Sequence, residues 1–574
     1  MVAIQNPATA ETGPAESGAE FSSSFEAGDP QPDWSNATED SSGVVQGSDG
    51  TPGMRTEVGE GPSEAFTAKP NVGFSGLRSL HYAGTQTSSD RGYAFNKVFD
   101  VNIPVSPSTT LSYKIFPALM DQDLGKGLPS PSTYVSVDLA FDDGAYLRDL
   151  GAEDQARFPL TADGQGASKR LYANHWNAVQ SRIGQVAEGR TITQILVDYD
   201  NPATGEGDFQ GWIDDIAITD DPAQAAPEHL ADWVVTTRGT DSNRGFSRGN
   251  NIPATAVPHG FNFWVPVTDA ETIRWMYQYQ EANNDENLPE LQALSLSHQP
   301  YPWGGERNTF QVMPAVGGEP ALDRKARALP FERSDEVAKP YYYGVTFTNG
   351  VQAEIAPADR AAIMRFTFTG DTSSLIFDNL TNDGGITLDP EKGVLTGYTD
   401  VNTDAAHRMF IYATFDRPVQ ADGRYPDSER PDVSGYYRFD TSGEDKTVTM
   451  RIATSLISVE QAKHNLELEI PEDTTFESVK EQARELWDEK LGVITDVQGA
   501  THDQLTTLYS SLYRLNLYPN RSHENTGTAD EPVYEHASQF APPVGESTPT
   551  RTGAKIEPGI AYRVSNFWDT YRTS

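Results

Sequence analysis

Hydrophobic and polar residues alternate with the two-residue period of β-strands along most of the chain, and turn residues separate the runs. The segment 134–143 carries the pattern most clearly, with Val135, Val137, Leu139 and Phe141 on one face. We expect that face to pack in a core, and the opposite face to contact solvent or a partner. The pattern is typical of an all-β sandwich, with strands expected at 97–105, 110–117, 134–143, 192–200 and 211–218.

A second strand-rich region follows a linker at 221–232 that is rich in proline, alanine and acid. It predicts a large antiparallel sandwich over 233–470, interrupted near 270–283 where Ile273, Met276 and Tyr277 share helical spacing. Strands are expected at 261–267, 309–316, 341–347, 364–369, 374–380, 409–415 and 447–455.

The hydrophobic period becomes helical after Pro471. Thr474 with Glu477, and Thr501 with Gln504, form capping-box patterns ahead of apolar stripes. We therefore predict two amphipathic helices within 471–517, and such helices need a partner surface. The stretch 519–560 is rich in proline, glycine and threonine, and its length predicts that it lines a site.

Composition indicates where the expected modules begin and end along the chain. Residues 1–65 are rich in Gly, Ser, Pro, Asp and Glu, which predicts a mostly flexible acidic leader, although the aromatic-framed turn at 21–34 is a candidate first strand. The expected modules are then a sandwich at 66–220, the linker 221–232, the large sandwich 233–470, linker helices 471–517 and a last segment 518–574.

Charge and residue usage narrow the range of partners. Lys and Arg number 43 against 83 Asp and Glu, a net charge of −40, which argues against nucleic acid or an anionic membrane surface as partner. No apolar stretch approaches the roughly 20 residues of a membrane span. Cysteine is absent and no signal peptide is visible at the start, so neither indicates a compartment. The sequence does not indicate an oligomeric state.

The stretch Arg248–Trp264 (RGNNIPATAVPHGFNFW) reads as a tightly shaped loop that leads into a strand. Its asparagines and His259 offer neutral donors and acceptors, and its aromatic residues offer flat apolar faces. This mixture suits a sugar, but it equally suits a buried turn whose aromatics fill a sandwich core. Both interpretations remain open from the residues alone.

The longer run 236–270 resembles the N-terminal domain of glycoside hydrolase family 92, the calcium-dependent exo-α-mannosidases. Further segments resemble the family in the same order, so that the resemblance covers about residues 230–574. They are SLSHQPYPWG (295–304), FQVMP (310–314), FERSDEVAKPYYYGVTFTNGVQAEI (331–355), ISVEQAKHNLELEI (457–470) and FWDTYR (567–572).

The resemblance implies a large antiparallel β-supersandwich, linker helices and the start of a truncated (α/α)6 barrel. With the sandwich expected at 66–220, which we predict to be a jelly-roll β-sandwich, the chain is expected to be mainly β. The resemblance also implies release of terminal mannose from α-mannosides such as N-glycans or mannan, with inversion and with calcium. Export to the cell surface or medium of a bacterium follows from the family as well. The alternative is a non-catalytic carbohydrate-binding or structural protein of two sandwich modules.

Inverting glycosidases need an acid and a base about 6.5–9.5 Å apart. The resemblance places both, with most calcium ligands, beyond Ser574, so we expect the chain to be inactive alone. It assigns substrate contact to Asp569, with Trp568 on the sugar ring and Arg572 beside the carboxylate. Further substrate-binding candidates are His298, Trp303, His259 and Gly260.

The ending GWIDDIAI (211–218) resembles jelly-roll modules that flank carbohydrate-active enzymes and sometimes bind sugar. Trp176, Tyr199 and Trp212 are the aromatic candidates of that module. For each of them core packing is favoured over stacking on a ligand.

Overall fold

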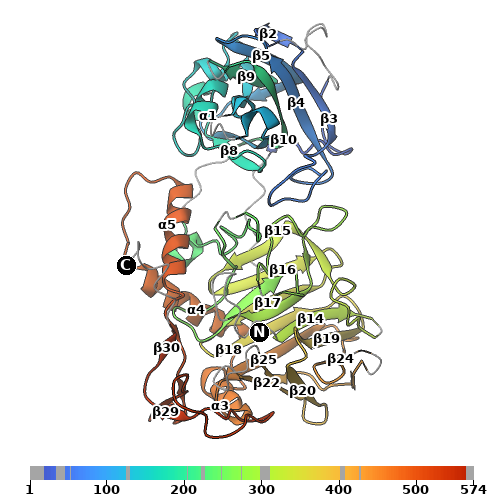
Figure 1. Cartoon of the computed structure of the whole chain (residues 1–574), viewed down its shortest axis with the longest axis vertical. Coiled ribbons are helices and arrows are strands. Elements are labelled where there is room, and N and C mark those ends of the chain that lie inside the picture. Colours follow the sequence, from blue (N-terminus) through green and yellow to red (C-terminus); the bar gives the residue numbers. More distant parts are fainter. Residues whose placement is uncertain are drawn as a thin grey trace, which may run out of the picture. The chain divides into compact units, whose positions relative to one another are not determined.

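The computed structural model describes residues 19–33, 45–51, 53–124, 130–202, 205–220, 226–246, 249–272, 274–297, 310–317, 319–400, 408–425, 428 and 430–563. They fall into two units, the first covering residues 1–225 with 285–287 and the second the rest of the chain (Figure 1). The described residues are mainly strand, as the alternating pattern predicts.

Two antiparallel sheets form the first unit. In its described residues one sheet has the order β3-β4-β10-β6-β8, with β1 paired to β10, and the other has the order β2-β5-β9-β7. The strands are β1 (Ala19–Ser23), β2 (Val45–Asp49), β3 (Arg55–Glu60), β4 (Arg78–Gln86), β5 (Gly92–Pro104), β6 (Thr109–Pro117), β7 (Val135–Phe141), β8 (Asn177–Ser181), β9 (Thr191–Asn201) and β10 (Gly207–Asp220). The short helices are α1 (Ala162–Ser168) and α2 (Gly184–Ala187).

The expected flexible leader therefore contributes strands to this unit. β1, β2 and β3 precede residue 66 and pair with β10, β5 and β4. β2 and β3 lie at sheet edges, where a strand needs few apolar side chains, so composition gives little sign of them.

The core of the first unit contains the predicted face of β7, with Val135, Val137 and Leu139 fully buried. The opposite face of β7 is buried too, because Arg148 covers it and pairs with Asp138 and with Asp198 (3.1 Å). Solvent was the wrong expectation for that face. Among the aromatic candidates, Trp176 and Tyr199 are buried and Trp212 is half-buried.

The second unit is a larger sandwich with helices. Its described strands form a sheet of order β11-β13-β14-β19-β24-β23 and a nine-stranded sheet of order β12-β15-β16-β17-β18-β25-β22-β21-β20. The strands of the first sheet are β11 (Phe263–Val267), β13 (Ala293–Ser297), β14 (Phe310–Val316), β19 (Thr372–Asn379), β24 (Ser434–Asp440) and β23 (Ala421–Gly423). Those of the second are β12 (Glu290–Leu291), β15 (Leu329–Lys339), β16 (Tyr342–Phe347), β17 (Gln352–Pro357), β18 (Ala361–Thr367), β25 (Thr447–Ser455), β22 (Met409–Phe415), β21 (Val394–Thr399) and β20 (Gly384–Asp389).

The helices of this unit are α3 (Val459–Glu469), α4 (Phe476–Leu491) and α5 (His502–Leu515), seen beside the sheets in Figure 1. Thr501 and Gln504 form the predicted capping box of α5, whereas the cap of α4 is Thr475 rather than Thr474. α3 lies inside the region 233–470, where the sequence predicts helical spacing near 270–283 and strands elsewhere. The described residues of 270–283 form no helix, because the Met276 carbonyl is bound by the backbone N–H groups of Thr268 and Asp269.

The described part of the last segment, 518–563, contains short strand pairs and no helix. The strands are β26 (Asn520–Arg521), β27 (Glu524–Asn525), β28 (Tyr534–Ala537), β29 (Ile556–Pro558) and β30 (Tyr562–Arg563). Ala537, Ala554 and Ile556 pack against the sandwich core, so this long segment is part of the second unit's packing.

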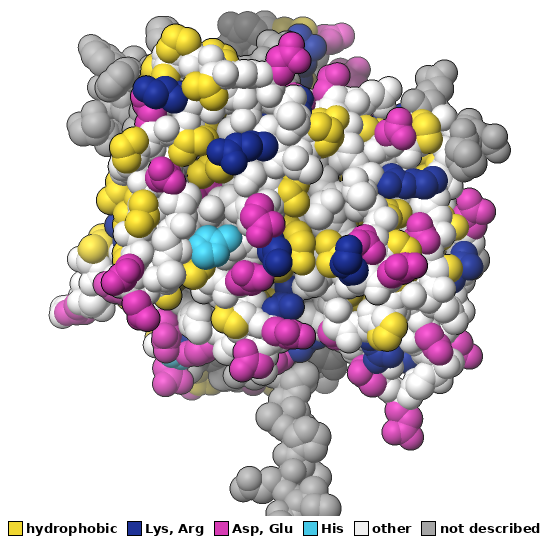
Figure 2. Space-filling model, turned by 90° about the horizontal axis from the view of Figure 1, so that it is seen from below, with side chains coloured by type: hydrophobic (Ala, Val, Ile, Leu, Met, Phe, Trp, Pro, Cys, Tyr) yellow, Lys and Arg dark blue, Asp and Glu magenta, His cyan; other side chains and the backbone are white. Residues whose placement is uncertain are grey.

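Acidic and basic side chains are interspersed on the face seen in Figure 2 rather than gathered by sign. This distribution agrees with a solvated acidic surface. Among the described residues no helix is long and apolar enough to cross a membrane.

Trp487 offers a test of how the helices are held. It is fully buried, its indole N–H donates to the Ala256 carbonyl (2.6 Å), and its ring packs on Tyr513. We expect Trp487→Ala to lower the free energy of unfolding by about 3–5 kcal/mol, measured by urea denaturation followed by circular dichroism. Leu486→Ala is the control, because Leu486 is 46% exposed and its loss should change stability by less than about 0.5 kcal/mol. Equal losses in the two variants would contradict this role.

Candidate functional site

The loop before β11 lies between the sandwich and the helices. The Ala256 carbonyl accepts from Trp487 of α4, and the Ala254 carbonyl accepts from the Tyr513 hydroxyl of α5. On the sandwich side, the side chain of Asn262 donates to the Arg360 carbonyl and to Thr454 (both 2.8 Å). The described part of Arg248–Trp264 therefore connects the sandwich to helices α4 and α5.

The aromatic side chains of this loop are not available to a ligand. Phe261, Phe263 and Trp264 are fully buried, and they fill the cores of the second unit. For these three residues the buried-turn interpretation holds. Gly260 is also buried, and an added Cβ would lie 3.0 Å from the Val257 carbonyl oxygen, so the close turn accounts for this glycine.

His259 is half-exposed, as are Asn250 and Asn251 among the described polar residues of the loop. Its φ of 54° lies in the left-handed region, which non-glycine residues seldom adopt. The ring Nδ1 lies 3.0 Å from the Pro519 carbonyl oxygen. Because a carbonyl only accepts, Nδ1 must carry the proton, and in neutral imidazole Nε2 is then an acceptor.

Burial and the nearby Lys490 lower the pKa of His259 below its usual 6.5. The ring is therefore neutral at pH 7. No described residue hydrogen-bonds Nε2, which leaves this atom able to accept from a ligand hydroxyl. The remaining predicted site residues, His298, Trp303, Trp568, Asp569 and Arg572, lie outside the described residues.

A pocket close to His259 was not anticipated from the sequence. It has a volume of about 270 Å³, and we call it the charged pocket. Its lining residues are Asp359, Arg360, Asn465, Leu468, Glu469, Arg521, His523, Asn525, Ala529 and Tyr534. They come from the β17–β18 turn, the end of α3 and the 521–534 segment, so no local motif could have revealed them.

Arg360 is the centre of the charged pocket. Its Nη1 lies 2.8 Å from Asp359 Oδ2 and 3.1 Å from Glu469 Oε1, and Nη2 donates to the His523 carbonyl. Arg521 contacts the other Asp359 oxygen at 3.3 Å. The backbone N–H of Phe261 donates to that same oxygen (2.8 Å), which connects the pocket to the His259 loop.

The two carboxylates of the pocket differ in their pKa values. Burial opposes ionisation of Asp359, but Arg360 and Arg521 hold its pKa below the ordinary value. Burial raises the pKa of Glu469 to about 7, against the opposing effect of Arg360. A difference of this kind is what acid–base catalysis uses.

The geometry nevertheless argues against a catalytic pair. Asp359 and Glu469 both point at the same arginine nitrogen, so they cannot flank a glycosidic bond from opposite sides, as inversion requires. Glu524, beside them, is fully buried, and it accepts from Leu456 N–H and from the Asn465 amide (both 2.8 Å). We interpret the charged pocket as a clamp that holds the 519–563 segment on the sandwich.

Calcium takes six to eight oxygen ligands, several of them carboxylates. The carboxylates of the charged pocket are turned to arginine and amide donors, and the described residues contain no group of three or more His, Asp or Glu able to hold a metal. The described residues therefore do not fit a calcium site by themselves.

Comparison with known proteins agrees with this architecture. Residues 233–455 match the glycosyl hydrolase family 92 N-terminal domain, and residues 461–574 match the family 92 catalytic domain. Both matches fall in the second unit, apart from residues 285–287, which belong to the first.

The proteins similar to this chain include a mannosidase of known structure and a secreted glycosidase. A family 92 inverting mannosidase from Bacteroides thetaiotaomicron is 31% identical, with a TM-score of 0.52, over 61% of this chain and 46% of that one. An uncharacterized secreted glycosidase from Arthroderma benhamiae is 25% identical over 47% of this chain and 40% of its own length. The chain thus spans less than half the length of either relative.

The two adjoining domain matches cover the second unit from Trp233 onward, and the solved mannosidase shares its fold. The chain belongs to glycoside hydrolase family 92.

Proposed function

We propose that this protein takes part in hydrolysis of α-mannosides, as a secreted exo-acting mannosidase that releases terminal mannose with inversion and depends on calcium. Family membership and the similarity to an inverting mannosidase support this proposal. The Arthroderma protein is described as secreted, which supports export.

The described residues would serve binding rather than proton transfer. Inversion needs an acid that protonates the leaving oxygen and a base that activates water on the opposite face. The described carboxylates of the charged pocket are paired with arginine, so this proposal places the acid and the base outside the described residues. It places the calcium ligands there as well.

His259 is the described residue that the proposal assigns to substrate. Its Nε2 would accept a hydrogen bond from a mannose hydroxyl, and the Pro519 carbonyl keeps the ring in the tautomer that this needs. Outside the described residues, Asp569 would accept from two hydroxyl groups, with Trp568 packing on the ring. Arg572 would orient Asp569, and His298 and Trp303 would complete the wall of the pocket.

The proposed function is tested by assaying the purified protein on 4-nitrophenyl α-mannoside, with and without a calcium chelator. We expect hydrolysis that the chelator abolishes and added calcium restores, with β-mannose as the first product detected by NMR. The 574-residue chain and the longest product of its coding DNA are assayed side by side, and we expect turnover from the latter. Absence of hydrolysis in both, with intact folding, would favour the non-catalytic alternative.

His259→Ala should raise KM and lower kcat/KM roughly 2- to 10-fold in the active form, the effect of one neutral hydrogen bond. The matched control is His536→Ala, because His536 is also half-exposed with Nδ1 on a backbone carbonyl (3.2 Å). Since the pKa of His259 lies below 6.5, its contribution should persist at neutral pH and disappear as acidification protonates Nε2. An unchanged KM, or an equal effect of the control, would remove His259 from the site.

Asp569→Ala should lower kcat/KM on the order of 100-fold or more, because a carboxylate that binds two hydroxyl groups contributes charge-assisted hydrogen bonds. Asp569→Asn keeps the shape and should lose less. The thermal unfolding midpoint should stay the same in both variants. Full activity of the alanine variant would exclude Asp569 from the substrate pocket.

A further inference from the structure

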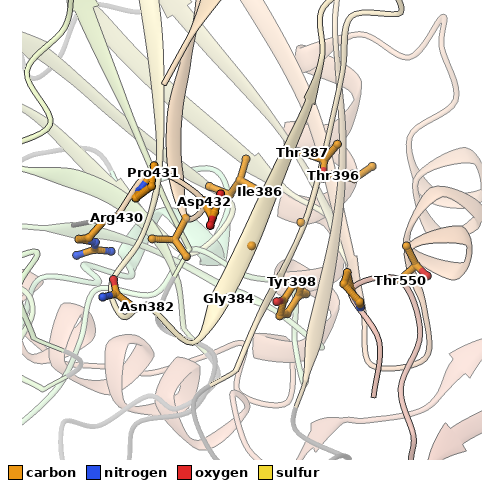
Figure 3. Close-up of a pocket in the computed structure, with 14 residues that line it drawn as sticks. Asn382, Gly384, Ile386, Thr387, Thr396, Tyr398, Arg430, Pro431, Asp432 and Thr550 are labelled. Atoms are coloured by element: carbon orange, nitrogen blue, oxygen red, sulfur yellow. The ribbon is translucent and has the colours of Figure 1, made fainter. Parts of the chain in front are cut away.

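A larger cleft lies at the far end of the nine-stranded sheet of the second unit, over the hairpin β20–β21 (Figure 3). Its volume is about 460 Å³, within the ~300–1,000 Å³ of typical ligand sites. We call it the hairpin cleft. Its lining residues are Asn382, Gly384, Gly385, Ile386, Thr387, Thr396, Gly397, Tyr398, Arg430, Pro431, Asp432, Val433, Pro549 and Thr550.

The alternation of side chains along β20 and β21 determines which residues of the hairpin face the cleft. Ile386 and Leu395 point into the sandwich core, so the paired Thr387 and Thr396 take the opposite face. Gly385 lies opposite Tyr398 on that same face, and an added Cβ there would lie 2.7 Å from the Tyr398 ring. Because Gly385 has no side chain, the Tyr398 ring can lie close to the backbone of β20, and the two together form the base of the cleft.

Two other segments form the walls. The backbone N–H of Ile386 donates to the Asp432 carbonyl (2.9 Å), which fixes the 430–433 loop along the edge of β20. Thr550, on the other side of the hairpin in Figure 3, comes from the long last segment, as does its neighbour in the chain, Pro549. Helices α3 and α4 pack on β25, β22, β17 and β18, whereas Thr387 on β20 is exposed.

Several polar side chains of the cleft make no hydrogen bond within the described residues. Within the described residues, no hydrogen bond engages the side chains of Asn382, Thr387, Thr396 and Asp432 or the hydroxyl of Tyr398. The lining arginine, Arg430, is already bound to the buried Asp378 (3.2 Å). Hydroxyl, amide and carboxylate groups without an unpaired cation suit a neutral polyhydroxylated molecule rather than an anion. The exposed Pro431 and Pro549 add apolar surface for the C–H faces of a sugar.

We propose that the hairpin cleft is a second, non-catalytic glycan-binding site that holds a neutral saccharide. It shares no lining residue with the charged pocket, and it does not contain His259. The choice of mannan as probe rests on the proposed function; the cleft itself rests on the geometry above. Such a site holds the polymer near the enzyme between cleavage events, which raises the effective substrate concentration.

The test is affinity electrophoresis of the 574-residue chain in gels that contain soluble yeast mannan. Thr387→Val with Thr396→Val removes two hydroxyl groups from an exposed and a half-exposed strand position and keeps β-branched side chains suited to a strand. We expect mannan to retard the native chain, and the double variant to bind roughly tenfold more weakly, the effect of losing two hydrogen bonds. Thr346→Val, at a half-exposed position of β16 in the same sheet, is the matched control and should bind like the native chain.

Hydrolysis of 4-nitrophenyl α-mannoside by the active form separates this proposal from the proposed function. The double variant should hydrolyse this small substrate at the native rate while it binds mannan weakly. Equal retardation of native and double-variant chains, or none by mannan, β-glucan or xylan, would overturn the cleft proposal even if hydrolysis is observed. Retardation by β-glucan or xylan that the double variant loses, without mannoside hydrolysis, would support the cleft and refute the mannosidase.

Discussion

Arg360 is a buried cation, and the surrounding structure depends on how its charge is satisfied. Its side chain is 8% exposed, and an arginine at that depth requires carboxylate and carbonyl partners. Asp359 comes from the same turn, Glu469 from the end of α3, and the His523 carbonyl from the last segment. Three segments far apart in the chain are thereby fixed to one another. Loss of any one partner would leave the buried charge of Arg360 incompletely compensated, so all three segments have to be in place together.

Contacts with the rest of the fold also account for most residues of the His259 loop. Its main-chain carbonyls bind Trp487 and Tyr513, and its aromatic rings enter the cores, so nearly all of its side chains serve architecture. His259 is different because the Pro519 carbonyl fixes its ring while leaving it half-exposed. The loop has the composition of a sugar site, but it mainly connects the sandwich to the helices. The His259 ring is held half-exposed, where a ligand could reach it.

Local periodicity predicted most of the sandwich. The expected strands 409–415 and 447–455 coincide with β22 and β25, because alternation is imposed by burial of one strand face. Edge strands such as β2 and β3 escaped detection because they bury little. The charged pocket could not be predicted, since Asp359, Glu469 and Arg521 meet only through tertiary structure. α3 escaped because its apolar stripe is narrow, with Ala462 and Leu466 as its buried apolar residues.

The distribution of charge also bears on how a ligand is recognised. The chain has 43 basic residues against 83 acidic ones, and arginines such as Arg360, Arg327 and Arg430 are paired with carboxylates of the fold. Surplus acid is left to solvent, where it disfavours anionic partners. Among the groups without a hydrogen bond in the described residues are the neutral His259 Nε2 atom and, in the hairpin cleft, the hydroxyls of Thr387 and Thr396 beside the Asp432 carboxylate. Neutral donors and acceptors match the hydroxyl groups of an uncharged glycan, because their hydrogen bonds are directional and require no charge compensation. With many of its cations paired inside the fold, this acidic chain is expected to bind an uncharged glycan at the two proposed sites rather than a charged polymer.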